Sequence, residues 1–225
     1  RIAQKIGLEN YKKFLNSLEL FNKINFDLDE VGSPLKFRWG KCKLATASFG
    51  RGIATTPLQL ARAYAILSNG GYEIEPSILK DKIKLNSKGK QIVSTDTSNL
   101  LNLMLRNVVS LKEGTANFAN VEGYEVGGKT GSSVKYTNNQ KLNTFVALFP
   151  SSRPKYVLLV MLDEPKAAPN FTYDMPPSKK FPTGYKYKGE TRNTSGWNTV
   201  VVAGKIIEKI GPILAINNLQ ASVNY

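Results

Sequence analysis

The stretch Gly123–Ser132, which reads GYEVGGKTGS, decides how the rest of the 225-residue sequence is interpreted. Two motifs overlap at its lysine. Residues Gly123–Thr130 match the phosphate-binding loop pattern G-x-x-x-x-G-K-[ST], which places the lysine at the start of a helix. Residues Lys129–Gly131 form a K-T-G tripeptide, which belongs to a different kind of site. The residues on either side of the stretch therefore decide between the two motifs.

A phosphate-binding loop needs a buried apolar strand before it and a helix that begins at its Lys-Thr pair. The residues before the motif, 118–124, are not a continuous apolar run. The residues after it, 131–139, read GSSVKYTNN and favour turns over a helix. The flanking sequence thus argues for a strand at Lys129, and a nucleotide-binding protein is kept as an alternative.

The sequence contains no histidine and a single cysteine, Cys42. These counts exclude Ser-His-Asp and Cys-His catalysis, histidine metal sites, thiolate metal clusters and an internal disulfide. Proton transfer must then rest on lysine, carboxylate, tyrosine or hydroxyl groups, or on a bound cofactor.

The chain is strongly basic, with 31 Lys and Arg residues against 17 Asp and Glu residues and a net charge of +14. Such a surface attracts nucleic acid, anionic lipid or an acidic substrate. The lysines are scattered, however, without clusters of arginine and aromatic residues. We therefore expect no nucleic-acid partner.

Apolar spacing and turn signals predict four helical regions. The best marked begins after Thr56, because Thr56 is a suitable N-cap, Pro57 takes the first helical position and Gln59 completes a capping box. The others are expected near 1–18 with a break at Gly7, near 97–110, and from about 199 to 216 with an interruption at Gly211-Pro212. In the helix near 97–110, six residues are expected to face inward: Leu100, Leu101, Met104, Leu105, Val108 and Val109.

Extended structure is expected between these helices. Residues 72–95 are predicted to form strands and turns, and Thr144–Phe149 and Tyr156–Leu162 are predicted to be adjacent antiparallel strands. The Pro-, Gly- and Lys-rich residues 165–196 are predicted to be a long surface loop. Helices around an antiparallel β-sheet indicate an α+β fold.

Several segments around the K-T-G tripeptide resemble class B penicillin-binding proteins, most closely the septal, cell-division type. The tripeptide itself occurs in penicillin-binding proteins and class A β-lactamases. The resemblance extends, with gaps, over most of the chain, and the segments that carry it are Leu44–Ala65, Val108–Gly131, Val160–Pro165 and Gly196–Ile207.

The resemblance implies a penicillin-binding/serine β-lactamase-like transpeptidase fold and a D,D-transpeptidase that cross-links peptidoglycan. A serine attacks the penultimate D-Ala carbonyl of a stem peptide, releases the terminal D-Ala and passes the acyl group to the amine of a neighbouring stem. The implied ligands are peptidoglycan stem peptides and β-lactam antibiotics, with no cofactor and no metal. A D,D-carboxypeptidase or a β-lactamase-related enzyme is the alternative within the same superfamily, because these enzymes share K-T-G.

The resemblance also assigns roles to the residues of the K-T-G strand. Lys129 is the catalytic residue that supports negative charge beside the serine, and Thr130 and Ser132 hold the substrate carboxylate. Gly131 lets the peptide backbone lie against the strand edge. The backbone N–H of Ser132 contributes to the oxyanion hole. Most members have threonine where this chain has Ser132, so the hydroxyl is kept and a methyl group is lost.

The nucleophile motif S-x-x-K and the motif S-x-N of the family precede K-T-G, and neither has a suitable counterpart here. Five S-x-x-K matches begin at Ser33, Ser77, Ser87, Ser132 and Ser152, and all look accidental from their Pro, Gly or strand context. The one S-x-N match is Ser222-Val223-Asn224, in the tail.

We therefore expect residues 1–225 to be the C-terminal portion of a single transpeptidase domain, inactive by itself, with its nucleophile outside this chain. The implied location is the bacterial periplasm, with an anchor to the inner membrane in an upstream segment. Cell-division membrane proteins are the implied partners of the full-length protein.

Overall fold

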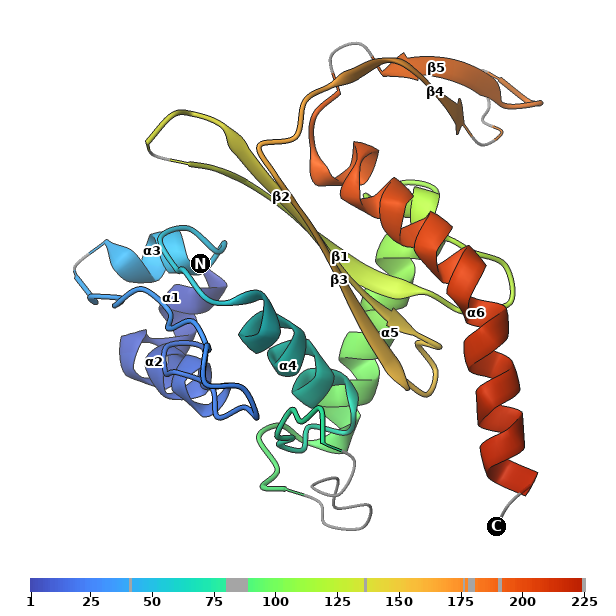
Figure 1. Cartoon of the computed structure of the whole chain (residues 1–225). Helices are drawn as coiled ribbons and strands as arrows, with labels where there is room; N and C mark the ends of the chain where they lie inside the picture. The colour runs from blue at the N-terminus through green and yellow to red at the C-terminus, as the bar shows by residue number, and fades with distance from the viewer. Residues whose placement is uncertain are drawn as a thin grey trace. The chain divides into compact units, whose positions relative to one another are not determined.

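The computed structural model describes residues 1–40, 42–79, 89–135, 137–175, 177, 181–189 and 192–223 (Figure 1). The chain forms two compact units. The first unit comprises Arg1–Met104 and Leu148–Leu158, and the second comprises Leu105–Ala147 and Leu159–Tyr225. The chain passes from one unit to the other within helix α5 and within strands β2 and β3, whose bounds are given below.

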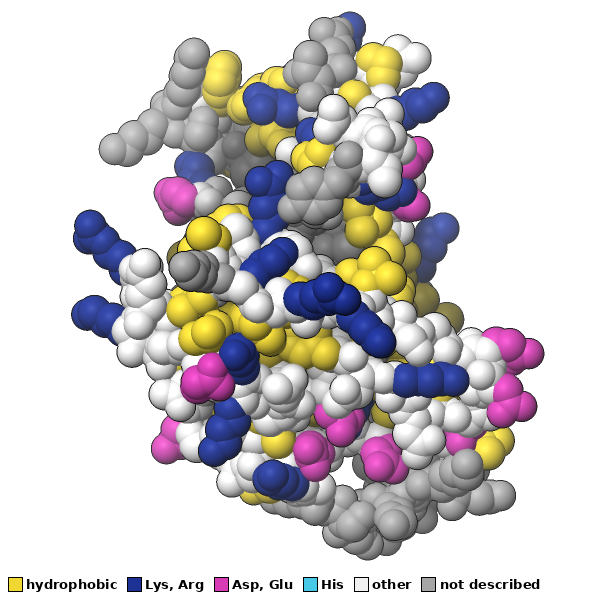
Figure 2. Space-filling view, turned by 90° about the vertical axis from the view of Figure 1, so that its left-hand side faces the viewer, with side chains coloured by type: hydrophobic (Ala, Val, Ile, Leu, Met, Phe, Trp, Pro, Cys, Tyr) yellow, Lys and Arg dark blue, Asp and Glu magenta, His cyan; other side chains and the backbone are white. Residues whose placement is uncertain are grey.

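Basic side chains are interspersed with neutral, acidic and hydrophobic side chains on the face that Figure 2 shows. On this face the basic side chains do not gather into one patch, in keeping with the scattered lysines of the sequence.

The first unit contains helices α1 (Ile2–Ile6), α2 (Leu8–Ser17), α3 (Lys43–Ala47) and α4 (Pro57–Ser68), and the start of α5 (Thr95–Ser110). The expected break at Gly7 is confirmed, because Gly7 has a φ of +83° and separates α1 from α2. The described residues between α4 and α5 form no regular strand. An isolated bridge between Tyr72 and Gln91 is the extended pairing found there, so the expected strands of 72–95 are absent from its described part.

Helix α4 begins as the sequence predicts. The Thr56 hydroxyl accepts a hydrogen bond from the backbone N–H of Gln59 at 3.2 Å, and the Gln59 side chain accepts one from the backbone N–H of Thr56 at 3.2 Å. Pro57 occupies the first turn, where it gives up no helical hydrogen bond. The capping box is therefore confirmed.

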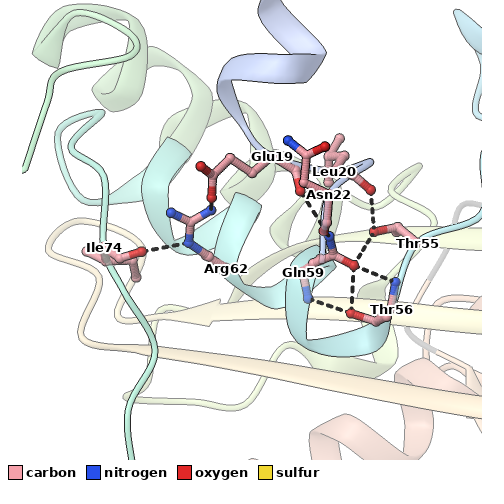
Figure 3. Close-up of polar contacts among 8 residues, drawn as sticks. All are labelled: Glu19, Leu20, Asn22, Thr55, Thr56, Gln59, Arg62 and Ile74. Carbon is pink, nitrogen blue, oxygen red and sulfur yellow. Dashed lines mark hydrogen bonds and ion pairs between the residues drawn. The ribbon is translucent and has the colours of Figure 1, made fainter. Parts of the chain in front are cut away.

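The Gln59 side chain also anchors the chain segment that follows α2 (Figure 3). Gln59 is 1% exposed, and its Nε2 donates to the backbone carbonyls of Glu19, at 2.9 Å, and Asn22. A buried polar group without a hydrogen-bond partner carries the full cost of its desolvation, and the Gln59 amide avoids that cost through these bonds. The same side chain thus caps α4 and hydrogen-bonds to the segment that follows α2.

A buried arginine, one turn further along α4, strengthens this attachment (Figure 3). Arg62 is 7% exposed, and its Nη1 lies 2.7 Å from a carboxylate oxygen of Glu19 while its Nε donates to the carbonyl of Ile74 at 2.6 Å. A buried charge is tolerated only when it is paired and hydrogen-bonded, and Arg62 meets both conditions. Helix α4 therefore joins two loops of the first unit.

We predict that Gln59→Leu lowers the free energy of unfolding by about 2–4 kcal/mol, because it removes the capping box and the two hydrogen bonds from the buried Gln59 amide to the carbonyls of Glu19 and Asn22. Urea denaturation followed by circular dichroism measures the change. Lys13→Leu, on the exposed side of α2, is the control and should stay within about 0.5 kcal/mol of wild type. Equal stability of the two variants would contradict this account.

Most of the sheet formed by β1 (Gly127–Val134), β2 (Lys141–Phe149) and β3 (Tyr156–Asp163), in the order β1-β2-β3, belongs to the second unit. Two backbone hydrogen bonds extend the antiparallel strand pairs. The N–H of Lys135 donates to the Gln140 carbonyl at 2.8 Å beyond β1 and β2, and the N–H of Glu164 donates to the Lys141 carbonyl at 2.8 Å between β3 and β2. Most of β2 is buried, as expected for the central strand of a covered sheet. The two strands predicted at 144–149 and 156–162 are confirmed, and both extend slightly further.

The buried face of helix α5 differs from the one that the sequence predicts. Leu105 and Val109 are buried as predicted, but Leu100 and Met104 are 54% and 55% exposed, and Leu103 between them is 59% exposed. Apolar spacing marks the helix correctly, but it cannot identify which of two adjacent apolar stripes is covered.

Helix α6 (Thr199–Val223) continues through Pro212, so the prediction of an interruption at Gly211-Pro212 and an end at 216 is wrong. Its buried stripe is Val200, Ala203 and Ile207. Gly204 lies against η2 (Asn117–Ala119), where an added Cβ would come within 2.5 Å of the Phe118 carbonyl. The packing of this stripe outweighs the hydrogen bond that a proline removes from a helix.

Residues 165–196 are not the irregular loop that their composition predicts. They contain the antiparallel pair β4 (Ala168–Met175) and β5 (Tyr185–Gly189), followed by η3 (Ser195–Trp197), as Figure 1 shows in orange. Phe171, Tyr173 and Met175 alternate along β4, and the Tyr173 ring lies 4.9 Å from that of Trp197. Packing of aromatic rings on Trp197 supplies a stability that the Pro, Gly and Lys content conceals. The expected α+β class, with an antiparallel sheet and flanking helices, is confirmed.

Candidate active site

The K-T-G tripeptide lies on a strand. Residues Gly127–Val134 are strand β1, and the turn before it contains Gly123, with a φ of +82°, and Glu125, with a φ of +46°. No helix begins at Lys129, so the helix N-terminus that a phosphate-binding loop requires is absent. The alternative of a nucleotide site at Gly123–Thr130 is therefore wrong.

Strand β1 lies at one end of the strand order, so within the described sheet its outer edge carries no neighbouring strand. Unpaired N–H and C=O groups on such an edge can pair with an extended peptide. The residues of the tripeptide are thus placed where a peptide substrate can add as a further strand.

Thr130 and Ser132 are two positions apart on β1, share one face of the strand and line a cavity of about 460 Å³. The Thr130 hydroxyl lies 3.1 Å from the hydroxyl of Thr115, and either can donate. The Ser132 hydroxyl accepts a hydrogen bond from the backbone N–H of Ser195 at 2.9 Å. The structure therefore brings the two predicted carboxylate-binding hydroxyls together and supports each from a different segment.

Lys129 is exposed and does not line this cavity. Its Nζ donates to the carbonyl of the next residue, Thr130, at 2.7 Å. The structure therefore places Lys129, the predicted catalytic lysine, on strand β1 next to Thr130, with its ammonium turned to its own backbone.

Gly131 faces strand β2. A Cβ at this position would lie 2.6 Å from the Thr144 hydroxyl oxygen, and that hydroxyl donates to the Gly131 carbonyl at 3.4 Å. A side chain at Gly131 would therefore displace the Thr144 hydroxyl and break its hydrogen bond to the Gly131 carbonyl. The resemblance implies a need for glycine on the substrate side, and this contact is a second reason for glycine here.

Ser195 supports the site through hydrogen bonds to β1, β2 and the start of α6. It is 1% exposed, its hydroxyl donates to the Thr144 carbonyl, and its oxygen lies 2.7 Å from the hydroxyl of Thr199 at the start of α6. Ser195 and Thr115 were not identified as site residues from the sequence. Thr115 lies within Val108–Gly131, one of the segments that resemble the family, and this resemblance is the sequence signal that could have identified it.

The cavity is also lined by three large apolar residues, Phe118, Met175 and Trp197. The rings of Phe118 and Trp197 lie 5.8 Å apart, and the guanidinium of Arg192 lies 5.1 Å from the centre of the Trp197 ring. These contacts hold the rings in place. The cavity thus combines hydroxyl groups with aromatic rings, which suits a ligand that has a polar and an apolar part.

Ser132 and Lys135 match S-x-x-K, but Lys135 is unsuited to act as a base. Its Nζ lies 2.5 Å from an oxygen of Asp163 and 2.9 Å from an oxygen of Glu164. These hydrogen bonds raise the pKa of Lys135, which keeps the ammonium protonated. A lysine that must accept a serine proton needs a lowered pKa, so the shift is in the wrong direction.

The other matches lie in less suitable surroundings. The pairs that begin at Ser33 and Ser152 are in irregular or turn segments. Lys80 and Ser87, which belong to the matches at Ser77 and Ser87, lie outside the described residues, as does Asn224 of the S-x-N match.

In the described part of the chain, no three His, Cys, Asp or Glu side chains gather as metal ligands. Among the helices described, none combines the length and the apolar character needed to span a bilayer.

We predict that Ser132→Ala raises the hydrogen-exchange rate of the Ser195 backbone N–H about fivefold, because that N–H loses its acceptor and one hydrogen bond contributes about 1 kcal/mol. Thr130→Val is the control, since Thr130 bonds to Thr115 and not to Ser195. Exchange measured by NMR should change in the first variant only. An unchanged Ser195 amide in Ser132→Ala would contradict the geometry.

The comparisons with known proteins concern most of the chain. The family model described as the penicillin binding protein transpeptidase domain matches residues 1–180. The "Probable peptidoglycan D,D-transpeptidase FtsI" of Caulobacter vibrioides is 33% identical over 229 residues, which cover 96% of this chain and 36% of that protein. "Stage V sporulation protein D" of Bacillus subtilis is 32% identical over 188 residues, which cover 76% of this chain and 29% of that protein.

Solved structures agree in fold. The transpeptidase domain of Burkholderia pseudomallei penicillin-binding protein 3 superposes with a TM-score of 0.72 at 23% identity, covering 94% of this chain and 60% of that one. The chain spans about a third of the length of these curated relatives.

Proposed function

Because this chain belongs to the penicillin-binding protein transpeptidase family, we propose that it is the C-terminal portion of a single transpeptidase domain of a peptidoglycan D,D-transpeptidase. The resemblance inferred from the sequence is thereby confirmed at the level of the family. The observation that carries the proposed activity is the K-T-G tripeptide on an edge strand, with Thr130 and Ser132 at a cavity beside it.

In the proposed reaction, a serine outside this chain attacks the penultimate D-Ala carbonyl of a stem peptide. The serine oxygen bonds to the carbonyl carbon, the bond to the terminal D-Ala nitrogen breaks, and D-Ala leaves with a proton on its amine. The amine of a second stem then attacks the acyl-enzyme, loses its proton and releases the serine. The reaction is a transfer between two amines, with no oxidation or reduction.

Strand β1 binds the donor peptide in this proposal. The hydroxyls of Thr130 and Ser132 donate to the carboxylate of the terminal D-Ala, and the backbone N–H of Ser132 donates to the carbonyl oxygen as it becomes negative. Gly131 allows the peptide to lie against the strand. The Lys129 ammonium is exposed and exchanges its backbone carbonyl for the negative charge of the bound substrate.

β-Lactam antibiotics would bind at the same place, because they carry a carboxylate next to a reactive carbonyl. The chain by itself is proposed to be inactive, since the pair Ser132–Lys135 has a lysine with a raised pKa and the other described S-x-x-K matches lie in irregular segments. Hydrolysis by a D,D-carboxypeptidase or a β-lactamase would need only water as acceptor. We favour transpeptidation because relatives that match most of the chain are named transpeptidases.

We also propose that the whole protein acts in the bacterial periplasm during cell division, anchored to the inner membrane by a segment outside this chain. Cell-division membrane proteins would be its partners. The support is the similarity to proteins whose names place them in peptidoglycan synthesis and sporulation.

Labelling with a fluorescent penicillin tests the proposed function. The whole protein should form a stable adduct, and the 225-residue chain alone should form none. In the whole protein, Thr130→Val and Ser132→Ala should each slow labelling at least about tenfold, because a hydrogen bond to a charged group contributes about 1.5–3 kcal/mol.

Ser133→Ala is the matched control, because Ser133 neighbours Ser132 but does not line the cavity. It should label at the wild-type rate. Stable labelling of the 225-residue chain that disappears when one of its own serines is replaced would show that the nucleophile lies within it, and would overturn the proposal.

A further inference from the structure

The cavity beside Thr130 and Ser132 contains one charged residue among the described residues that line it, and that residue is Lys112. The remaining lining residues are hydroxyl, amide, glycine, apolar or aromatic residues. Lys129, to which the sequence assigns the charge of the site, is not part of this lining and donates to its own strand. The positive charge inside the cavity therefore comes from a residue outside the K-T-G tripeptide.

The backbone that carries Lys112 is held in place on both sides. The N–H of Gly114 donates to the Leu111 carbonyl at 2.9 Å, and the N–H of Ala116 donates to the Val108 carbonyl at 3.2 Å. The turn after α5 thus presents Lys112 at the rim of the cavity at a fixed position. Only the long side chain has to move to meet a ligand.

The charge of Lys112 is also uncompensated in the described structure. The side chain is exposed and forms no ion pair or hydrogen bond with another described residue. Its neighbour Glu113 lines neither this cavity nor the adjoining one. A free ammonium at the rim of a partly enclosed cavity attracts anions more strongly than one on an open surface.

A second cavity, of about 540 Å³, adjoins the first, and Lys112, Phe118 and Met175 line both. The second cavity also includes the acidic residue Asp174. Asp174 lies opposite Lys186 in the register of β4 and β5, so a basic residue faces it across the strand pair. Lys112 therefore occupies the junction of two cavities, and Asp174 has a basic neighbour of its own.

We propose that Lys112 is a specificity-determining residue that attracts the carboxylate of the substrate or of a β-lactam into the cavity lined by Thr130 and Ser132; this inference rests on the proposed function. The hydroxyls supply short, directed hydrogen bonds, and Lys112 supplies the charge that favours an anionic ligand over a neutral one of the same shape. Lys129, on the neighbouring strand position, adds to this positive charge once its ammonium turns from its own backbone to the bound substrate.

Acylation of the whole protein by benzylpenicillin and by its neutral methyl ester tests this role. Wild type should react faster with the acid, and Lys112→Gln should lower the acid-to-ester rate ratio about tenfold while leaving the ester rate unchanged. Lys112→Arg should restore the ratio. The dependence of the acid rate on NaCl concentration should be weaker in Lys112→Gln than in wild type. Glu113→Gln, one residue away, is the control and should not lower the ratio.

Three outcomes overturn the inference in distinguishable ways. If wild type reacts with neither compound, the proposed function fails and the role of Lys112 fails with it. If wild type reacts and Lys112→Gln keeps the wild-type ratio, the proposed function stands and the role of Lys112 fails. If Lys112→Gln slows both compounds equally, the residue supports the fold of the cavity and does not select the charge of the ligand.

Discussion

The buried hydroxyl of Ser195 is the contact on which the candidate site depends. It donates to the Thr144 carbonyl on β2 and lies 2.7 Å from the Thr199 hydroxyl at the start of α6, while the backbone N–H of the same residue donates to Ser132 on β1. Ser195 therefore links β1, β2 and the start of α6, and it is 1% exposed. Because the residue is buried, these hydrogen bonds take the place of contacts with water. The position of Ser132 is therefore supported by the segment that contains Ser195 as well as by its own strand.

The absence of histidine gives this site its chemistry. With no imidazole in the chain, positive charge comes from arginine and lysine side chains, and the lysine ammonium groups remain protonated unless burial or like charge lowers their pKa. The structure divides these lysines into distinct roles. Lys135 is engaged by Asp163 and Glu164, with its pKa raised. Lys129 is held on its own strand, and Lys112 stands at the cavity rim. The net charge of +14 alone does not distinguish these environments.

Local signals made part of this structure predictable. The capping box at Thr56–Gln59 and the strand at Lys129–Gly131 depend on residues that are neighbours in sequence, so their patterns were sufficient. The hairpin of β4 and β5 was missed, because Tyr173 is stabilised by Trp197, more than twenty residues away, in a stretch whose composition resembles a loop. The role of Ser195 was missed for the same reason, since a buried hydroxyl looks like any other serine until its partners are known. Family resemblance predicts the fold and the K-T-G strand. It does not identify Ser195, whose backbone N–H donates a hydrogen bond to Ser132 on that strand.

We propose that a carboxylate-bearing acyl donor lies along the outer edge of β1. The most direct measurement is a crystal structure of the whole protein acylated by benzylpenicillin. We expect the carboxylate of the adduct within hydrogen-bond distance of the Thr130 and Ser132 hydroxyls, and the acyl carbonyl oxygen accepting from the Ser132 backbone N–H. An adduct whose carboxylate lies away from both hydroxyls, or whose carbonyl is bound by another segment, would contradict it.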